Sequence, residues 1–215
     1  MPVITISRQL GSGGGVVATE VAARLGWQLL DRALVERIAE DLNVAPEQVA
    51  QHDERVETFV ERIGQYLSEG FPEVMPLAVL PPVSPEATAR AARRVIGVLP
   101  DDRPAVVVGH GAQCILRGHE AAFHVLTHAP LPLRISRARD AFQCGAEEAE
   151  RRIRQSDRDR TRYVREHFGE DWLSPSLYDL CIDTGRLGVG GAVELIGRGA
   201  QRVFRAGGGL SPEVF

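Results

Sequence analysis

The stretch that decides the fold is residues 3–26, which read VITISRQLGSGGGVVATEVAARLG. It opens with the β-branched run Val3-Ile4-Thr5-Ile6 and continues into a glycine cluster at residues 11–15. Apolar residues then follow at the helical spacing i, i+4, i+5 and i+8, from Val17 to Leu25, before Gly26. This order predicts a buried strand, a glycine-rich loop and a helix that ends at a glycine.

Further strand candidates alternate with helical patterns along the rest of the chain. Short apolar runs lie at residues 29–30, 105–108, 123–127 and 180–184, and helical periodicity marks residues 34–42, 86–99, 130–138, 146–167 and 191–203. Strands that alternate with helices predict an α/β fold, a doubly wound parallel sheet of about five strands with helices on both faces. Any ligand is then expected at the carboxyl ends of the strands.

Composition limits the protein to an ordinary globular class. The chain has 215 residues, a net charge of −4, 44% hydrophobic and 25% charged residues, which excludes collagen, coiled coil and wholesale disorder. No apolar run approaches a membrane span and no leader pattern opens the chain, so we expect a cytoplasmic protein with no membrane partner. Three scattered cysteines, Cys114, Cys144 and Cys181, predict reduced, buried thiols and no zinc site.

The glycine cluster is placed to bind phosphate, because backbone amides at the start of a helix attract anions. The Walker pattern is a glycine, four residues, then glycine, lysine and a hydroxyl residue. With Gly13 as its second glycine, the first is Arg8, the lysine is Gly14 and the hydroxyl residue is Gly15. Two interpretations stay open, a plain turn or a phosphate loop in which Arg8 or an arginine from a mobile helix replaces the lysine.

Arginine supplies every basic side chain, and seven of the 25 lie between residues 151 and 165. Spacings of three or four residues put five of them on one helical face. Such a face can grip phosphate, or it can be solvated and paired with neighbouring glutamates. Nucleic-acid binding is disfavoured, because the chain is acidic overall and this stretch has few aromatic residues. The five arginines are Arg151, Arg154, Arg158, Arg162 and Arg165.

Taken together, the order of these features resembles the cytidylate kinase-like family of P-loop nucleoside monophosphate kinases. The resemblance covers most of the chain, in a branch with a non-standard Walker loop. It rests on Ile4-Thr5-Ile6-Ser7-Arg8-Gln9 with Gly11-Ser12-Gly13-Gly14, on Leu30-Asp31-Arg32, on Val107-Val108-Gly109, on Asp157-Arg158-Asp159-Arg160-Thr161-Arg162 and on Asp183-Thr184-Gly185-Arg186-Leu187.

This resemblance implies transfer of the ATP γ-phosphoryl group to a nucleoside monophosphate such as CMP or dCMP, with Mg²⁺ carried by the nucleotide rather than by a protein metal site. It implies a P-loop kinase domain over residues 1–205, with a helical and proline-rich acceptor-side insertion at about 43–100, an arginine-rich lid at about 145–170 and a flexible tail at 206–215. The insertion could form an acceptor flap or a homodimer surface.

Site residues follow from the same resemblance. ATP phosphates would be held by the loop residues Gly11, Ser12, Gly13, Gly14 and Gly15. Catalytic cations would be Arg158 and Arg162 from the lid, with Arg8 as the candidate replacement for the lysine. Acceptor contacts would come from Asp31, Arg32, Asp159 and His110.

Departures from the family's pattern leave alternatives open. Gly14 stands for the lysine, and Val108-Gly109-His110-Gly111 replaces an Asp-Gly-Arg-Asp pattern after the third strand. His110 could contact a substrate phosphate or cap the next helix. The whole chain could be a kinase, a nucleotide-binding or regulatory protein that lost transfer chemistry, or a kinase for another small acceptor.

Overall fold

A computed structural model describes residues 1–43, 85–99 and 103–205 of the chain. Most of the insertion expected at about 43–100 and all of the tail expected at 206–215 lie outside the described residues.

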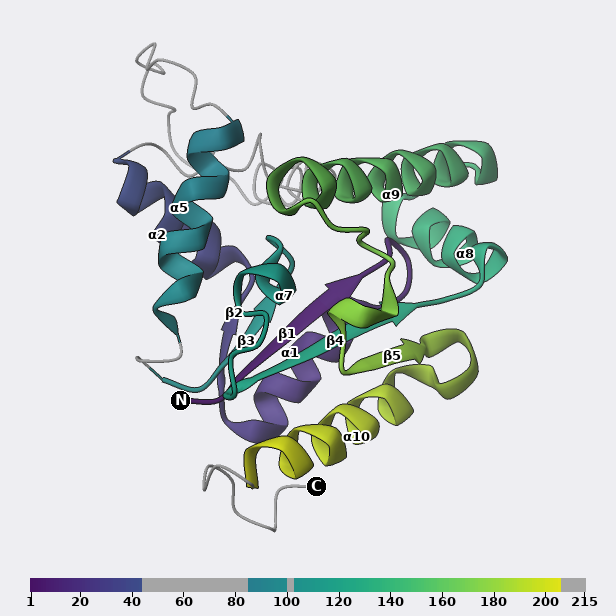
Figure 1. The fold of residues 1–215 in the computed structure, drawn as a ribbon. Helices are drawn as coiled ribbons and strands as arrows, with labels where there is room; N and C mark the ends of the chain where they lie inside the picture. The colour runs from purple at the N-terminus through teal and green to yellow at the C-terminus, as the bar shows by residue number, and fades with distance from the viewer. Residues whose placement is uncertain (44–84, 100–102, 206–215) are drawn as a thin grey trace, which may run out of the picture.

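Five parallel strands form one sheet, as the alternation of strands and helices predicts (Figure 1). The strands lie in the order β2-β3-β1-β4-β5, so β1 is central and pairs with both β3 and β4. Every residue of β1 is buried, which agrees with the β-branched run Val3-Ile4-Thr5-Ile6 that forms most of it. The strands are β1 (Val3–Arg8), β2 (Gln28–Leu30), β3 (Ala105–Val108), β4 (Ala122–His128) and β5 (Leu180–Asp183).

Helices cover both faces of the sheet. On one face α1 (Gly14–Leu25) and α10 (Thr184–Arg205) pack over the sheet, and on the other lie α2 (Arg32–Leu42), α5 (Pro85–Gly97) and the short α7 (Ala112–Ile115). Successive residues of a strand serve opposite faces: Val107 packs with α2 and α5, whereas Val106 and Val108 pack with α1 and α10.

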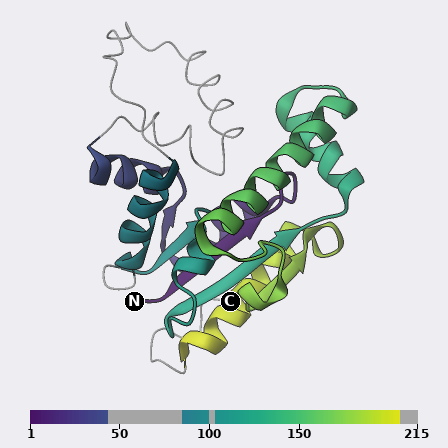
Figure 2. The ribbon, with the colours of Figure 1, turned by 45° about the horizontal axis from the view of Figure 1, so that its top comes forward.

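Two further helices, α8 (Leu131–Phe142) and α9 (Ala146–Phe168), pack on each other beyond the carboxyl ends of the strands (Figure 2). Their apolar cluster joins Ala138, Ala149 and Ile153, and Leu10 from the glycine-rich loop packs against it. The loop after β1 therefore meets the α8–α9 pair at the edge of the sheet where parallel folds bind ligands.

Cysteine burial differs from the prediction. Cys114 and Cys144 are half-buried and Cys181 is exposed, so the prediction of buried thiols is wrong for Cys181. The reason is that β5 is an edge strand, and its alternate side chains face solvent. None of the described helices is long and apolar enough to cross a membrane.

Two glycines of α10 give a direct test of the packing on the sheet. A Cβ at Gly199 would lie 2.6 Å from Cζ of the buried Phe123 ring, whereas a Cβ at Gly190 would meet nothing within 4 Å. We expect Gly199→Ala to lower the free energy of unfolding by about 1–3 kcal/mol, because overpacking displaces a core ring. Gly190→Ala is expected to leave it unchanged or raise it by up to about 1 kcal/mol. Urea denaturation measures both, and equal effects would contradict the described packing.

Candidate functional site

The glycine-rich loop, residues 9–13, connects β1 to α1 at the carboxyl edge of the sheet. Gly11 and Gly13 adopt left-handed φ values of 77° and 81°, and Gly13 is the N-cap of α1. The amide of Val17 makes the first intrahelical hydrogen bond, to the carbonyl of Gly13 at 3.0 Å. The amides of Gly14 and Gly15 precede that bond and therefore point out of the helix end, where an anion can accept from them.

Arginines of α8 hold the carbonyl side of the loop. Arg134 donates from Nε to the carbonyl of Leu10 at 2.7 Å, and Arg137 donates from Nη1 to the carbonyl of Ser12 at 3.0 Å and to that of Gly11 at 3.3 Å. Thr184 also donates its hydroxyl to the carbonyl of Ser12. With three successive carbonyls satisfied by these donors, the loop is fixed in a conformation that leaves its amide side for a ligand.

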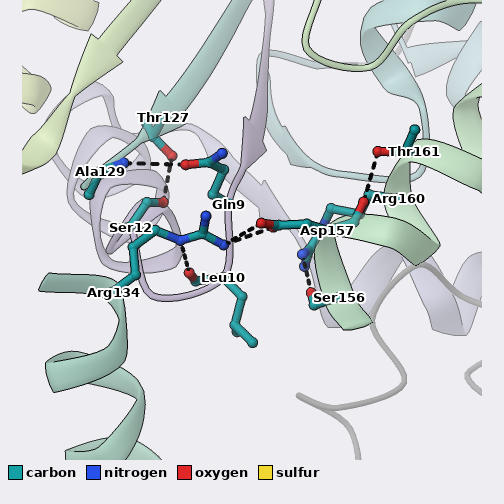
Figure 3. A network of polar contacts seen from close by, with 10 residues as sticks. All are labelled: Gln9, Leu10, Ser12, Thr127, Ala129, Arg134, Ser156, Asp157, Arg160 and Thr161. Carbon is teal, nitrogen blue, oxygen red and sulfur yellow. Dashed lines mark hydrogen bonds and ion pairs between the residues drawn. The ribbon is translucent and has the colours of Figure 1, made fainter. Parts of the chain in front are cut away.

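The opposite edge of the loop is tied to β4 (Figure 3). The hydroxyls of Ser12 and Thr127 are 3.2 Å apart, and the Gln9 side-chain oxygen accepts from the amide of Ala129 at 3.4 Å. Gly11 also lies directly on the backbone of α8, since a Cβ there would be 2.7 Å from the carbonyl oxygen of Arg134. Space as well as backbone conformation therefore demands glycine at position 11.

Arg8 is the last residue of β1 and is 8% exposed. It lies against Gly14, the residue that occupies the lysine position of the Walker pattern. Ser12 is fully buried, and Gly15 opens onto free space, with nothing within 4 Å of a Cβ built there. The structure thus places Arg8 beside the loop residues 11–15.

A pocket of about 400 Å³ runs along α9. Asp157 connects this pocket to the loop, because its carboxylate accepts two hydrogen bonds from Arg134, at 2.8 and 2.9 Å. Arg134 thus contacts the loop with one nitrogen and α9 with another (Figure 3). The pocket is lined by Asp157, Arg158, Thr161, Arg162, Arg165 and Glu166.

Arginines in the first half of α9 are paired with glutamates of the same helix. Arg151 and Arg152 both donate to Glu148, which lowers the pKa of that carboxyl, and Arg154 donates to Glu150. For these three residues the interpretation as a solvated, paired surface holds. Arg158 and Arg162 are also exposed and are bonded within the helix, to Gln155 and Asp159, but both line the pocket as well.

Asp159 is not among the residues that line the pocket, and its carboxylate instead binds Arg162. Its carboxylate accepts from Arg162 and, at 2.9 Å, from Gln155, whose own side-chain oxygen accepts from Arg158 at 2.6 Å. A chain of hydrogen bonds therefore orients the two arginines that the sequence analysis singles out, Arg158 and Arg162.

His110 lies after β3, beside the central strand, because Ile6 pairs with Val108. It is buried and has a φ of 59°, between the left-handed Gly109 and Gly111. Gly111, not His110, is the N-cap of α7, so the interpretation of His110 as a helix cap is wrong. A left-handed backbone is uncommon outside glycine, and histidine is among the residues that tolerate it.

Asp31 follows β2, the edge strand next to β3. It occupies the N-cap position of α2 without a side-chain capping hydrogen bond. Arg32 is the first residue of α2. Both belong to the carboxyl edge, but β3 separates their strand from β1. The structure therefore places Asp31 and Arg32 farther from the loop than Arg8 and His110.

The C-terminal end of α9 reaches the same edge. The Phe168 ring packs on Gly111, since a Cβ at Gly111 would lie 2.4 Å from its Cε2 atom. The guanidinium carbon of Arg93 in α5 lies 4.8 Å from the centroid of that ring. Helix α9 is thus held near its middle, where Asp157 binds Arg134, and at its C-terminal end, where Phe168 packs beside β3.

Sequence reasoning missed Arg134, Arg137, Thr127 and Thr184 as part of the site. Their partners are more than 110 residues away along the chain, so no local pattern joins them to the loop. A usable signal existed, because α8 follows β4 and must begin at the carboxyl edge, with two arginines three residues apart in its first two turns.

Comparison with known proteins agrees with this architecture. The family model of the cytidylate kinase-like family matches residues 3–186. A solved structure of an uncharacterized protein from Eubacterium ventriosum has a TM-score of 0.67 at 18% identity, covering 92% of this chain and 97% of that one. A gluconokinase from Sinorhizobium meliloti has a TM-score of 0.53 at 14% identity, covering 95% and 97%. No curated protein matches the chain.

The contact between Arg134 and Asp157 can be tested by a double-mutant cycle. Arg134 is 5% and Asp157 28% exposed, so removal of either partner leaves a largely buried group unpaired. We expect Arg134→Ala and Asp157→Ala to be non-additive by at least about 1 kcal/mol in the free energy of unfolding. The exposed pair Arg198 and Glu194 of α10 is the control, with a coupling of about 0.3–0.5 kcal/mol. Equal couplings for the two pairs would contradict a buried link between loop and α9.

Proposed function

The chain belongs to the cytidylate kinase-like family, and on this premise we propose that it transfers the γ-phosphoryl group of ATP to a nucleoside monophosphate, with CMP or dCMP as the first candidates. The observation that carries the proposal is the loop of residues 9–13, whose carbonyls are bound by Arg134 and Arg137 while the helix-end amides of Gly14 and Gly15 stay available. A row of amides at a helix N-terminus is suited to a polyphosphate.

Phosphoryl transfer requires positioning and charge neutralisation more than covalent chemistry. An oxygen of the acceptor phosphate attacks the γ-phosphorus, the bond from that phosphorus to the bridging oxygen breaks, and ADP leaves. The acceptor phosphate is largely ionised near neutral pH, with a pKa of about 6, so no general base is needed. The donors available at the carboxyl edge, backbone amides and arginines, match that requirement.

Acceptor binding is assigned to the pocket along α9. Arg158 and Arg162 contribute two permanent positive charges to it, and Asp157 connects it to the phosphate loop through Arg134. Arg158 and Arg162 would stabilise the negative charge of the transferring group, and Asp159, which accepts from Arg162, would hold that arginine in place. Asp31, Arg32 and His110, at the ends of β2 and β3, would complete the acceptor side.

Mg²⁺ would be carried by the nucleotide. Among the described residues no group of three or more His, Cys, Asp or Glu side chains could hold a metal ion, and the Walker hydroxyl position is Gly15. When bound, Mg²⁺ neutralises charge on the β- and γ-phosphate oxygens. The backbone amides of Gly14 and Gly15 and the arginines of the site would orient the phosphates around the Mg²⁺.

The proposal is tested by ADP formation from magnesium-ATP with a panel of acceptors: CMP, dCMP, UMP, AMP, GMP and, as a non-nucleotide acceptor, gluconate. We expect turnover that depends on one of the nucleotides, because the pocket offers arginines to a phosphate-bearing acceptor. Binding of ATP is measured on the same sample by calorimetry.

Other outcomes separate the alternatives. Turnover that depends on gluconate would indicate a kinase for a small acceptor other than a nucleotide. ATP binding without turnover on any acceptor would favour a nucleotide-binding or regulatory protein of the same fold. Absence of both binding and turnover would mean that the glycine-rich loop is only a turn.

Arginines of the pocket give a second test. We expect Arg158→Ala and Arg162→Ala each to lower kcat about 100-fold or more, because each removes a charge that stabilises the transition state. Arg198→Ala on the exposed surface of α10 is the control, and its kcat should stay within about twofold of the wild type. Wild-type kcat in either pocket variant would remove α9 from the proposed mechanism.

A further inference from the structure

Gly14 is the first residue of α1, and the space beside it is already filled. A Cβ at this position would lie 2.5 Å from Cβ and 3.3 Å from Cγ of Arg8, and 2.3 Å from the hydroxyl oxygen of Thr127. Non-bonded carbon atoms approach to about 3.5–4 Å. The obstructing Arg8 atoms are the base of the side chain, which cannot swing away, so position 14 is closed to every residue but glycine while Arg8 is present.

This closure depends on space and not on conformation. Gly14 has none of the left-handed φ values that mark Gly11 and Gly13. Its neighbour Gly15 has nothing within 4 Å of a Cβ, although both glycines belong to the first turn of the same helix. The first turn of α1 therefore has one closed and one open position, which provides a matched pair for experiment.

Positions 8 and 14 are the first and seventh of the eight positions of the Walker pattern. In that pattern the first position is glycine and the seventh is lysine, whereas here the first is arginine and the seventh is glycine. Because the stem of Arg8 occupies the space of a side chain at position 14, the two positions cannot both carry one. Either arrangement leaves the loop with one long cation and one glycine.

We propose that Arg8 and Gly14 are an exchanged pair: the cation of the phosphate loop comes from the end of β1 instead of the start of α1, and glycine at position 14 makes room for it. The inference rests on the proposed function, since it names the group that holds the nucleotide phosphates. Arg8 is then a binding residue, and Gly14 is a positioning residue that acts through Arg8.

Electrostatics supports an anionic ligand beside Arg8. The start of α1 carries the positive end of the helix dipole, and Arg134 and Arg137 add two guanidinium groups against the same loop. Arg8 is only 8% exposed, and the base of its side chain lies beside Gly14 at the same helix start. A phosphate on the amides of Gly14 and Gly15 would be stabilised by the helix dipole and by these guanidinium groups.

The test is whether a lysine at position 14 weakens ATP binding when position 8 is arginine and strengthens it when position 8 is glycine. Four proteins are compared, the wild type, Gly14→Lys, Arg8→Gly and the double variant Arg8→Gly/Gly14→Lys, by calorimetric binding of magnesium-ATP and by thermal melting. We expect Gly14→Lys and Arg8→Gly each to weaken ATP binding by about tenfold or more, the contribution of one charge-assisted hydrogen bond. In the Arg8→Gly background the same lysine should strengthen binding by a similar factor.

Gly15→Lys, placed at the open position, is the control and should have the same effect in both backgrounds. Thr127 still borders position 14 in the double variant, so the comparison is repeated with Thr127→Ala, which removes the second obstacle. A lysine at position 14 that has equal effects in both backgrounds overturns the proposal. Wild-type ATP affinity in Arg8→Gly also overturns it, as does a wild-type protein that binds no magnesium-ATP.

A wild type that binds no magnesium-ATP overturns both this inference and the proposed function, whereas the other outcomes separate the two. Measurements of ATP binding and of thermal melting need no acceptor. The opposite effects of the lysine on ATP affinity in the two backgrounds can therefore be observed even if no acceptor in the panel is phosphorylated. Conversely, turnover with CMP together with equal effects of the lysine in both backgrounds would support the kinase activity. It would mean that another arginine supplies the cation of the loop.

Discussion

A loop can turn its amides toward a ligand only if its carbonyls find donors on the other side, and this constraint governs the site. The donors here are Arg134 and Arg137, which bind the carbonyls of Leu10, Gly11 and Ser12. Both arginines are fixed because α8 starts directly after β4, the strand next to β1 in the sheet. Sheet order thus determines which helix stands beside the loop, and that helix determines the direction of the loop backbone.

Helix α9 extends the same constraint across the carboxyl edge. Asp157, in the middle of α9, binds the arginine that already holds the loop, and Phe168, at the C-terminal end of α9, packs on Gly111 after β3. Arg134 therefore connects the loop directly to α9, the helix whose exposed side carries Arg158 and Arg162. In the proposed function, this connection links a nucleotide bound at the loop to the pocket along α9 through Arg134 and Asp157.

The fold could be predicted from the sequence because its signals are local. The β-branched run at residues 3–6, the buried run at residues 105–108 and the glycine cluster each indicate their own element, and five such strands appear in the sheet. The site could be predicted only where its residues are near in sequence, as with Arg8 and the glycines. Arg134 was missed because its partner Leu10 is 124 residues away and accepts through a backbone carbonyl, which any residue possesses. The closure of Gly14 by Arg8 likewise depends on three-dimensional spacing that the letters do not encode.

Arginine as the sole basic residue has a consequence for the proposed chemistry. A guanidinium stays charged at every pH a protein tolerates, unlike a buried ammonium, whose pKa falls readily on burial. The cations of the proposed site, the buried Arg8 and the pocket residues Arg158 and Arg162, are all guanidinium groups. The acceptor phosphate is the group that gains a second negative charge near neutral pH. The ionisation that prepares the proposed reaction thus belongs to the acceptor, and the protein contributes fixed charges and oriented amides.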